Sequence, residues 1–335
     1  MVLITGATGF IGSYLTRHLV NQGYPVRALR RKNSDLSLLA EARDKVEWVE
    51  ADVLDIPALE DAFRGVKKVF HLASLISFDP ADRDRMMKIN VEGTANVVNL
   101  CLVFGIEKLV FAGSYSSLGT PENHDPIHED TGWNKNPHDS FYSFSKLQAE
   151  REVWRGIAEG LQAVIVNPTL VLGAGKWSDS STRLFGAMTS WQPFYPIGST
   201  GFVDVRDVAR IMHLLMESQV SGEKFILNAE NLSFAEVIRE IAHQLGKKPP
   251  LWPLNHFWIP LARSVDWLRA SLTGTKPLFN AEVAGITTAH LKYDNRKIRT
   301  LLHYEFIPVK QSIAETVAQL RKSLETRTPY AVLDI

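Results

Sequence analysis

Short apolar runs alternate with amphipathic segments over the first 170 residues of the chain. Brief runs of Val, Leu and Ile are typical of buried strands, whereas apolar residues three or four positions apart indicate helices. The pattern predicts strands at residues 2–4, 26–29, 46–49, 69–72, 108–111 and 163–166, and helices at 57–63, 90–104, 143–159 and between the first two strands. Such alternation predicts an α/β fold, a doubly wound parallel sheet with helices on both faces.

After the sixth predicted strand the pattern changes. Residues 173–200 are rich in Gly, Ser, Trp and Pro, which is typical of loops and not of a continuing sheet. A strand followed by a helix is predicted at 203–217, and a further strand at 224–227. Ser233 and Glu236 then predict a helix that begins with a capping box. The rest of the chain is predicted to be mainly helical.

This change of pattern predicts two domains. The sheet domain is expected to comprise residues 1–170 plus about 201–229. A smaller, mainly helical C-terminal lobe is expected from about 171–200 plus 230–335. A length of 335 residues is enough for one large α/β domain that carries such a second lobe.

Composition narrows the class of protein. Equal numbers of basic and acidic residues, 37 each, exclude a nucleic-acid binder that relies on bulk positive charge. Cys101 is the only cysteine, so we expect no intrachain disulfide, no metal site and a cytoplasmic location. The first strand begins at residue 2, so we expect no signal peptide. The longest aromatic-rich stretch, 251–272, contains two prolines, Arg263 and Asp266, so we expect no membrane span.

A glycine-rich loop lies directly between the first strand and the first helix. Its pattern, G-x-x-G-x-x-G, allows a tight turn, close approach of a pyrophosphate to the backbone, and close packing of helix on strand. The helix N-terminus then offers free N–H groups to the phosphates. The alternative is a purely structural turn. We expect dinucleotide binding by Gly6, Gly9, Phe10, Ile11 and Gly12.

The end of the second strand indicates which dinucleotide binds. An NAD site usually carries an acidic residue there, whereas this chain has Arg30, Arg31 and Lys32 and no acid before Asp35. A guanidinium can bind the 2′-phosphate of NADP, which a carboxylate would repel. We therefore favour NADP(H) over NAD(H), with Arg31 and Lys32 as the phosphate ligands. A solvated basic run is the alternative.

Tyr142 and Lys146 are four residues apart at the start of a predicted helix, on one face. A nearby cation stabilises a phenolate and lowers the pKa of tyrosine toward neutrality, which makes tyrosine a usable acid–base group. Ser114 follows a predicted strand, and the carboxyl ends of such strands border the ligand crevice of α/β sheets. An ordinary helix pair is the alternative interpretation of Tyr142 and Lys146 taken alone.

Taken together, these motifs resemble the extended short-chain dehydrogenase/reductase superfamily. The resemblance covers essentially the whole chain, with its motifs in the right order, and it implies a Rossmann-like sheet with a substrate-binding C-terminal lobe. The segments that carry it are residues 5–12, 71–73, 90–94, Ser114 with Tyr142 and Lys146, 167–173, 201–209 and 293–297.

The resemblance implies roles for individual residues. Tyr142 would be the general acid–base, and Lys146 would lower the pKa of Tyr142 and bind the nicotinamide ribose. Ser114 would form a hydrogen bond with the substrate oxygen. Tyr142 and Lys146 would thus also contact the cofactor, and the further cofactor contacts would be Asp52, Val53, Leu72, Ala73, Ser74, Asn90, Asn167, Pro168 and Leu170.

Within the superfamily, the chain is most similar to the dihydroflavonol-reductase group of NADPH-dependent carbonyl reductases. The similarity rests on Arg31, on the Asn-Pro-Thr-Leu-Val stretch from Asn167 and on the hydrophobic C-terminal lobe. Sugar-nucleotide enzymes usually carry an arginine where this chain reads Ser-Thr-Gly-Phe at 199–202, and here 173–200 contains only two basic residues. Ala112-Gly113 also lacks the threonine of a dehydratase.

We therefore expect an NADP(H)-dependent oxidoreductase that reduces a ketone or aldehyde of a small to medium, mostly apolar substrate. The enzymatic alternatives are an NAD-dependent nucleotide-sugar epimerase and a 3β-hydroxysteroid-like dehydrogenase. The non-enzymatic alternative is an NADP-binding redox sensor, which would not need a proton donor. A small molecule is the expected partner, and the family likeness makes a homodimer plausible.

Aromatic residues gather in the second lobe. Trp177, Trp191, Phe194 and Tyr195 lie in the loop-rich segment, where they fit the wall of an apolar substrate site or packing between lobes. Another aromatic group fits a core helix better than a pocket cap or a membrane-surface contact. Its members are Trp252, Phe257, Trp258 and Trp267.

Overall fold

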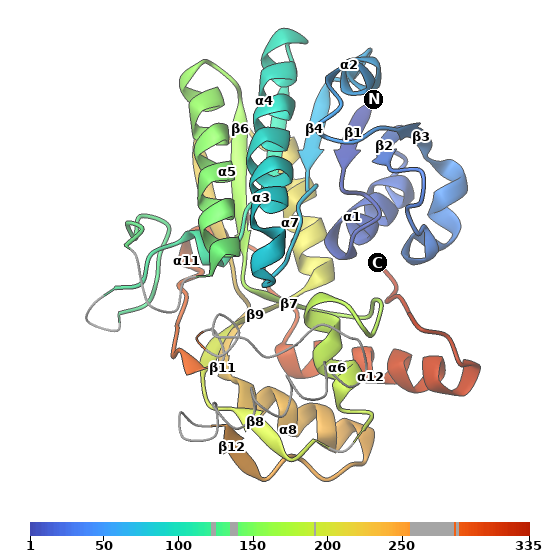
Figure 1. Ribbon diagram of the computed structural model, residues 1–335, viewed down its shortest axis with the longest axis vertical. Helices are drawn as coiled ribbons and strands as arrows, with labels where there is room; N and C mark the ends of the chain where they lie inside the picture. The colour runs from blue at the N-terminus through green and yellow to red at the C-terminus, as the bar shows by residue number, and fades with distance from the viewer. Residues whose placement is uncertain (122–124, 135–139, 191, 255–284, 286–287) are drawn as a thin grey trace.

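The computed structural model describes residues 1–121, 125–134, 140–190, 192–254, 285 and 288–335. At its centre is a seven-stranded sheet of parallel strands in the order β10-β6-β5-β4-β1-β2-β3 (Figure 1). The order runs outward from β1 in both directions, which confirms the predicted doubly wound, Rossmann-like fold. The strands are β1 (Val2–Thr5), β2 (Val26–Arg30), β3 (Glu47–Glu50), β4 (Lys68–His71), β5 (Lys108–Ala112), β6 (Ala163–Pro168) and β10 (Glu223–Leu227).

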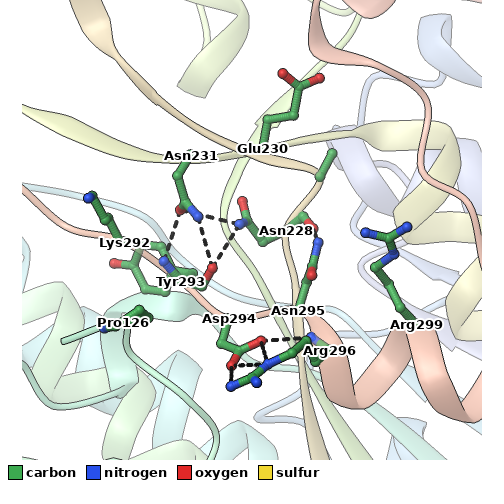
Figure 2. A pocket seen from close by; sticks show the side chains of 11 residues that line it. Pro126, Asn228, Glu230, Asn231, Lys292, Tyr293, Asp294, Asn295, Arg296 and Arg299 are labelled. Atoms are coloured by element: carbon green, nitrogen blue, oxygen red, sulfur yellow. Dashed lines mark hydrogen bonds and ion pairs between the residues drawn. The ribbon is translucent and has the colours of Figure 1, made fainter.

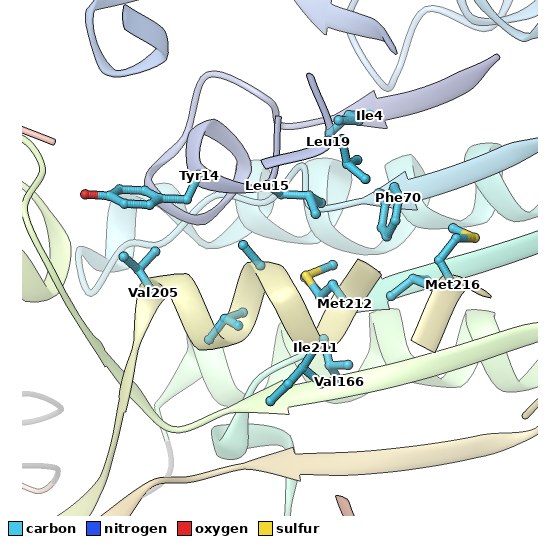
Figure 3. Close-up of a cluster of buried hydrophobic side chains, with 14 of the residues drawn as sticks. Ile4, Tyr14, Leu15, Leu19, Phe70, Val166, Val205, Ile211, Met212 and Met216 are labelled. Carbon is cyan, nitrogen blue, oxygen red and sulfur yellow. The ribbon is translucent and has the colours of Figure 1, made fainter. Parts of the chain in front are cut away.

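Helices cover both faces of this sheet because successive strand residues point to opposite sides. Ile4 and Phe70 belong to a buried cluster that includes Leu15 and Met212 of the helices on one face (Figure 3). Leu3, next to Ile4, belongs to the cluster on the other face. The helices of the first face are α1 (Phe10–Asn21) and α7 (Val205–Glu217), and those of the second are α2 (Ile56–Phe63), α4 (Gly93–Val103) and α5 (Phe141–Ala158).

The second part of the chain adds two small sheets and further helices. Strand β9 pairs parallel to β7 and antiparallel to β11, and β12 pairs parallel to β8. The predicted capping box is confirmed, since the Ser233 hydroxyl accepts from the Glu236 N–H and the Glu236 carboxylate accepts from the Ser233 N–H. These elements are β7 (Leu170–Leu172), α6 (Arg183–Ala187), β8 (Phe194–Pro196), β9 (Ser199–Asp204), β11 (Glu230–Ser233), α8 (Phe234–Leu245), β12 (Trp252–Leu254), α11 (Arg296–Leu302) and α12 (Val309–Thr326).

Some details differ from the sequence predictions. The predicted helix at 90–104 is not uniformly α-helical, because a π-helical turn at Met87–Glu92 precedes α4. Trp252 lies on a strand, is exposed, and packs against Phe194 with ring centroids 5.7 Å apart, so it does not fill a core helix. Four of the other aromatic residues named above lie outside the described residues: Trp191, Phe257, Trp258 and Trp267.

In the described ranges, no helix is long and apolar enough to cross a membrane. Over the same ranges, no group of three or more His, Cys, Asp or Glu side chains could bind a metal ion.

Candidate active site

The predicted site residues come together at one edge of the central sheet. Because all seven strands run parallel, their carboxyl ends share that edge, where ligands of α/β proteins bind. The Rossmann strands each contribute a following segment. The glycine loop follows β1, Arg31 and Lys32 follow β2, Asp52 and Val53 follow β3, Leu72, Ala73 and Ser74 follow β4, Ser114 follows β5, and Asn167 and Pro168 end β6, with Leu170 just beyond.

The glycine loop has the geometry of a phosphate cradle. Gly6 has φ of 71°, and a Cβ there would lie 2.6 Å from the Ala73 nitrogen. A Cβ on Gly12 would lie 2.1 Å from the Gly6 oxygen. Gly9 occupies the N-cap position of α1 and has no side chain that could accept a hydrogen bond. The first N–H groups of the helix therefore have no side-chain acceptor. This loop therefore fits the pyrophosphate of a dinucleotide.

A buried hydrogen-bond chain ties this loop to the segment after β4. The Thr94 hydroxyl donates to the Asn90 carbonyl at 2.6 Å, so it accepts from His71 Nε2 at 2.9 Å. His71 Nδ1 then accepts from the Thr5 hydroxyl at 2.6 Å. The Thr5 oxygen in turn accepts from the Ala73 N–H at 3.2 Å. Burial lowers the pKa of His71 to about 3, so the ring stays neutral and keeps this arrangement.

Asn90 joins the same segment to α5. Its side-chain oxygen accepts from the Leu75 N–H at 2.7 Å and from the Ser74 hydroxyl at 3.1 Å. Its amide nitrogen donates to the Ser145 hydroxyl at 3.0 Å. Asn90 is only 1% exposed, so it fixes the segment after β4 against α5, and its part in cofactor binding stays a prediction.

Ser114 and Tyr142 form the centre of the candidate active site. Ser114 lies two residues beyond the end of β5 and caps the short turn Tyr115–Ser117. Tyr142 lies in the first turn of α5, where the Ser140 hydroxyl caps the helix. The Ser114 hydroxyl forms a hydrogen bond with the Ser116 hydroxyl at 2.8 Å and also lies within hydrogen-bonding reach of the Tyr142 phenol. Burial raises the pKa of Tyr142 above its usual value, and the hydrogen bond with Ser114 opposes this increase, so the phenol is neutral.

Lys146 lies one turn beyond Tyr142, but its ammonium group is engaged elsewhere. The Nζ atom donates to the Ala112 carbonyl at 2.8 Å and lies 4.7 Å from the centroid of the Phe111 ring. Burial lowers the pKa of Lys146 to about 8, and the charge of Glu150 opposes this decrease. The largest influence on the Tyr142 pKa in this arrangement is burial, which raises it, and the lowering of this pKa by Lys146 stays a prediction.

A second buried network, not recognised from the sequence, supports Ser114. The Asn167 amide donates to the Ser114 carbonyl at 2.9 Å and to the Glu150 carboxylate at 3.1 Å. The Ser117 hydroxyl donates to the same carboxylate at 2.7 Å. A Cβ on Gly113 would lie 2.7 Å from the Asn167 nitrogen, so a glycine before Ser114 is required by this contact. The Asn167 side chain thus lies beneath the Ser114 turn.

A separate cavity of about 630 Å³ is lined by other residues (Figure 2). It is lined mainly by residues 228–231 and 292–296 together with Arg299. The amides of Asn228 and Asn231 donate to the Tyr293 carbonyl at 3.2 and 2.9 Å. The Tyr293 ring packs against Tyr115, with centroids 5.5 Å apart. The cavity includes none of Ser114, Tyr142 and Lys146, so we do not assign it to the same chemistry.

Comparisons with known proteins agree with this geometry. The model of the NAD dependent epimerase/dehydratase family matches residues 2–228. Cinnamoyl-CoA reductase 1 of Petunia hybrida is 30% identical over 338 aligned positions, which cover 96% of this chain and 92% of the relative. A putative dihydroflavonol 4-reductase of Synechocystis sp. is 29% identical over 94% of this chain and 92% of its own length. The crystal structure of gox2253 matches with a TM-score of 0.82 and 31% identity, over 96% of this chain and 98% of that one.

The fold and the edge site define a Rossmann-type enzyme that uses a nicotinamide dinucleotide. The chain belongs to the NAD-dependent epimerase/dehydratase family. With its reductase relatives, it is an NAD(P)-dependent oxidoreductase of the extended short-chain dehydrogenase/reductase type. This confirms the resemblance inferred from the sequence motifs.

Proposed function

We propose that the protein is an NADP(H)-dependent reductase of a ketone or aldehyde in a small to medium, mostly apolar substrate, able also to oxidise the corresponding secondary alcohol. The observation that carries the proposal is the placement of Ser114 just beyond the carboxyl end of β5 and of Tyr142 in the first turn of α5, with Lys146 one turn away. The similarity to proteins named cinnamoyl-CoA reductase and putative dihydroflavonol 4-reductase supports carbonyl reduction.

The chain's own residues would handle the proton and the developing charge. When bound, the dinucleotide would supply the hydride that reduces the carbonyl carbon. Ser114 donates a hydrogen bond to the carbonyl oxygen, which stabilises the negative charge that develops there. Tyr142, neutral because of burial, donates its phenolic proton to that oxygen. The charge of Lys146 then stabilises the phenolate that remains on Tyr142.

Two features support NADP(H) as the cofactor. Arg31 and Lys32 lie exposed on the loop after β2, the position at which an acidic residue would bind the ribose hydroxyls of NAD. Within the described residues neither forms an ion pair, so both cations are available to a 2′-phosphate.

The test is Tyr142→Phe, which removes the proton donor and keeps the ring. We expect the variant still to bind NADPH and carbonyl reduction to fall by at least about 100-fold, the usual contribution of a general acid. The matched control is Tyr115→Phe, which removes a neighbouring phenolic hydroxyl that lies next to Ser114 in the chain. We expect the control to retain most of its activity. Near-normal turnover by Tyr142→Phe would refute the proposed role of this residue.

A further inference from the structure

The end of β2 and the loop that follows it carry three cations and one carboxylate. The cations are Arg30, Arg31 and Lys32, and the carboxylate is Asp35. The Arg30 Nε atom is buried and has no hydrogen-bond partner among the residues described. Arg31 is anchored through its backbone, because its N–H donates to the Ser34 hydroxyl at 2.9 Å, while its side chain stays exposed. The loop therefore presents positive charge whose effect depends on the state of Asp35.

Asp35 forms an ion pair with a residue from a distant segment. Lys176 Nζ lies 2.9 Å from the Asp35 carboxylate, with side chains 29% and 53% exposed, respectively. The hydrogen bond from Lys176 lowers the pKa of Asp35, as does the bond that the carboxylate accepts from the Ser37 N–H. Asp35 is thus charged at neutral pH, and Lys176 neutralises it.

The backbone around Lys176 is firmly placed. The Trp177 N–H donates to the Pro329 carbonyl at 3.2 Å, and the Ala331 N–H donates to the Gly175 carbonyl at 3.1 Å. Lys176 itself forms an antiparallel bridge with Tyr330. On the other side, a Cβ on Gly175 would lie 3.1 Å from the Phe10 ring, so this segment packs against the start of α1. The ammonium group is therefore carried by a segment fixed beside the phosphate loop.

We propose that Lys176 is a specificity-determining residue for the phosphorylated dinucleotide, acting by neutralising Asp35 on the loop that carries Arg31 and Lys32. The inference rests on the proposed NADP(H)-dependent function. A 2′-phosphate is a multiply charged anion that an unpaired carboxylate on the same loop would repel, whereas NADH carries no charge at this position. With Asp35 paired to Lys176, the remaining charge of the loop is purely positive.

The experiment measures NADPH and NADH affinity of the nucleotide-free protein by quenching of intrinsic fluorescence. Lys176→Met exposes the Asp35 charge, and we expect NADPH affinity to fall by about tenfold, the factor that corresponds to about 1.4 kcal/mol. NADH affinity should change by less than about twofold, and the NADPH effect should shrink in high salt, which screens exposed charges. Asp35→Asn alone should leave NADPH affinity equal or higher. The double variant Lys176→Met/Asp35→Asn should return to within about twofold of the unaltered protein.

A matched control separates the local effect from the general loss of a surface ion pair. Lys68 forms an ion pair with Glu217 at 2.8 Å, with side chains 25% and 39% exposed. Lys68 is the first residue of β4, so it lies at the amino-terminal end of the strands, opposite the carboxyl ends that border the candidate site. Lys68→Met should change neither affinity.

The outcomes distinguish this inference from the function on which it rests. If the unaltered protein binds NADH as tightly as NADPH, the proposed cofactor preference itself is refuted. If the unaltered protein prefers NADPH but Lys176→Met weakens both cofactors equally, or neither, only the role of Lys176 is refuted. A double variant that stays as weak as Lys176→Met would likewise show that neutralisation of Asp35 is not how Lys176 acts.

Discussion

Substitution of single glycines in the loop after β1 separates the structural from the ligand-binding role of that loop. In Gly12→Ala the added Cβ would lie 2.1 Å from the Gly6 oxygen and 3.0 Å from the Ala7 Cα. Carbon atoms make favourable contact at about 3.5 Å, so the first distance is short by more than about 1 Å. All the obstructing atoms belong to the backbone, and no change of side-chain rotamer can relieve the overlap.

We therefore expect Gly12→Ala to lower the free energy of unfolding by about 1–3 kcal/mol, the usual effect of overpacking. The displaced loop should also lose cofactor affinity by at least about tenfold. Gly9→Ala is the informative contrast, because its Cβ would lie no closer than 3.3 Å to the Gly6 oxygen. Gly9 is exposed at the start of α1, so its Cβ would occupy space that a pyrophosphate approaches.

The assay combines urea unfolding with NADPH titration of each variant. Gly9→Ala should keep its stability within about 0.5 kcal/mol and still bind NADPH more weakly. Gly132→Ala is the control, since no atom lies within 4 Å of its added Cβ, and it should change neither quantity. Unaltered NADPH affinity in Gly9→Ala, or unaltered stability in Gly12→Ala, would contradict the reasoning.

Two further predictions concern α5. Burial lowers the pKa of Lys146 to about 8, so the charge of Lys146 is present below this pH and is lost above it. We therefore expect kcat/KM for carbonyl reduction to fall above about pH 8. A flat pH profile of kcat/KM from about pH 7 to about pH 10 would contradict this expectation. Glu150→Ala removes the buried carboxylate that accepts from Ser117 and Asn167 and pairs with Lys224, and it should lower the free energy of unfolding by about 3 kcal/mol in urea titrations. Glu159→Ala, on the exposed end of the same helix, should change it by less than about 0.5 kcal/mol, and equal effects of the two substitutions would contradict this account.

The central sheet was predictable because strands buried on both faces show as apolar runs. Residues 2–4, 108–111 and 163–166 illustrate this, since each run matches an observed strand closely. The small sheets were missed because β7 and β11 have only three or four residues and no apolar run long enough to stand out. Strand β9 was recognised only from residue 203, although it begins at Ser199, because Ser-Thr-Gly has the composition of a turn.

The candidate site was predictable where residues follow strands in a fixed order. Glu150 was missed, although it continues the spacing of Tyr142 and Lys146 by one more turn, because its partners Ser117 and Asn167 come from distant segments. The ion pair of Asp35 with Lys176 was hidden for the same reason. A sequence shows the spacing of residues along one helix but not which remote side chain completes a buried or paired charge.

The most direct test of the proposed reaction follows the hydride. The protein would be incubated with NADPH deuterated at the transferable position and with a panel of apolar ketones and aldehydes, and the products analysed by mass spectrometry. The proposal requires one deuterium on the new alcohol carbon and one oxidised nucleotide released per alcohol formed. The proposed reduction would be contradicted by a nucleotide that stays tightly bound, by the absence of deuterium from every alcohol, and by isomerisation of a nucleotide sugar without net oxidation or reduction.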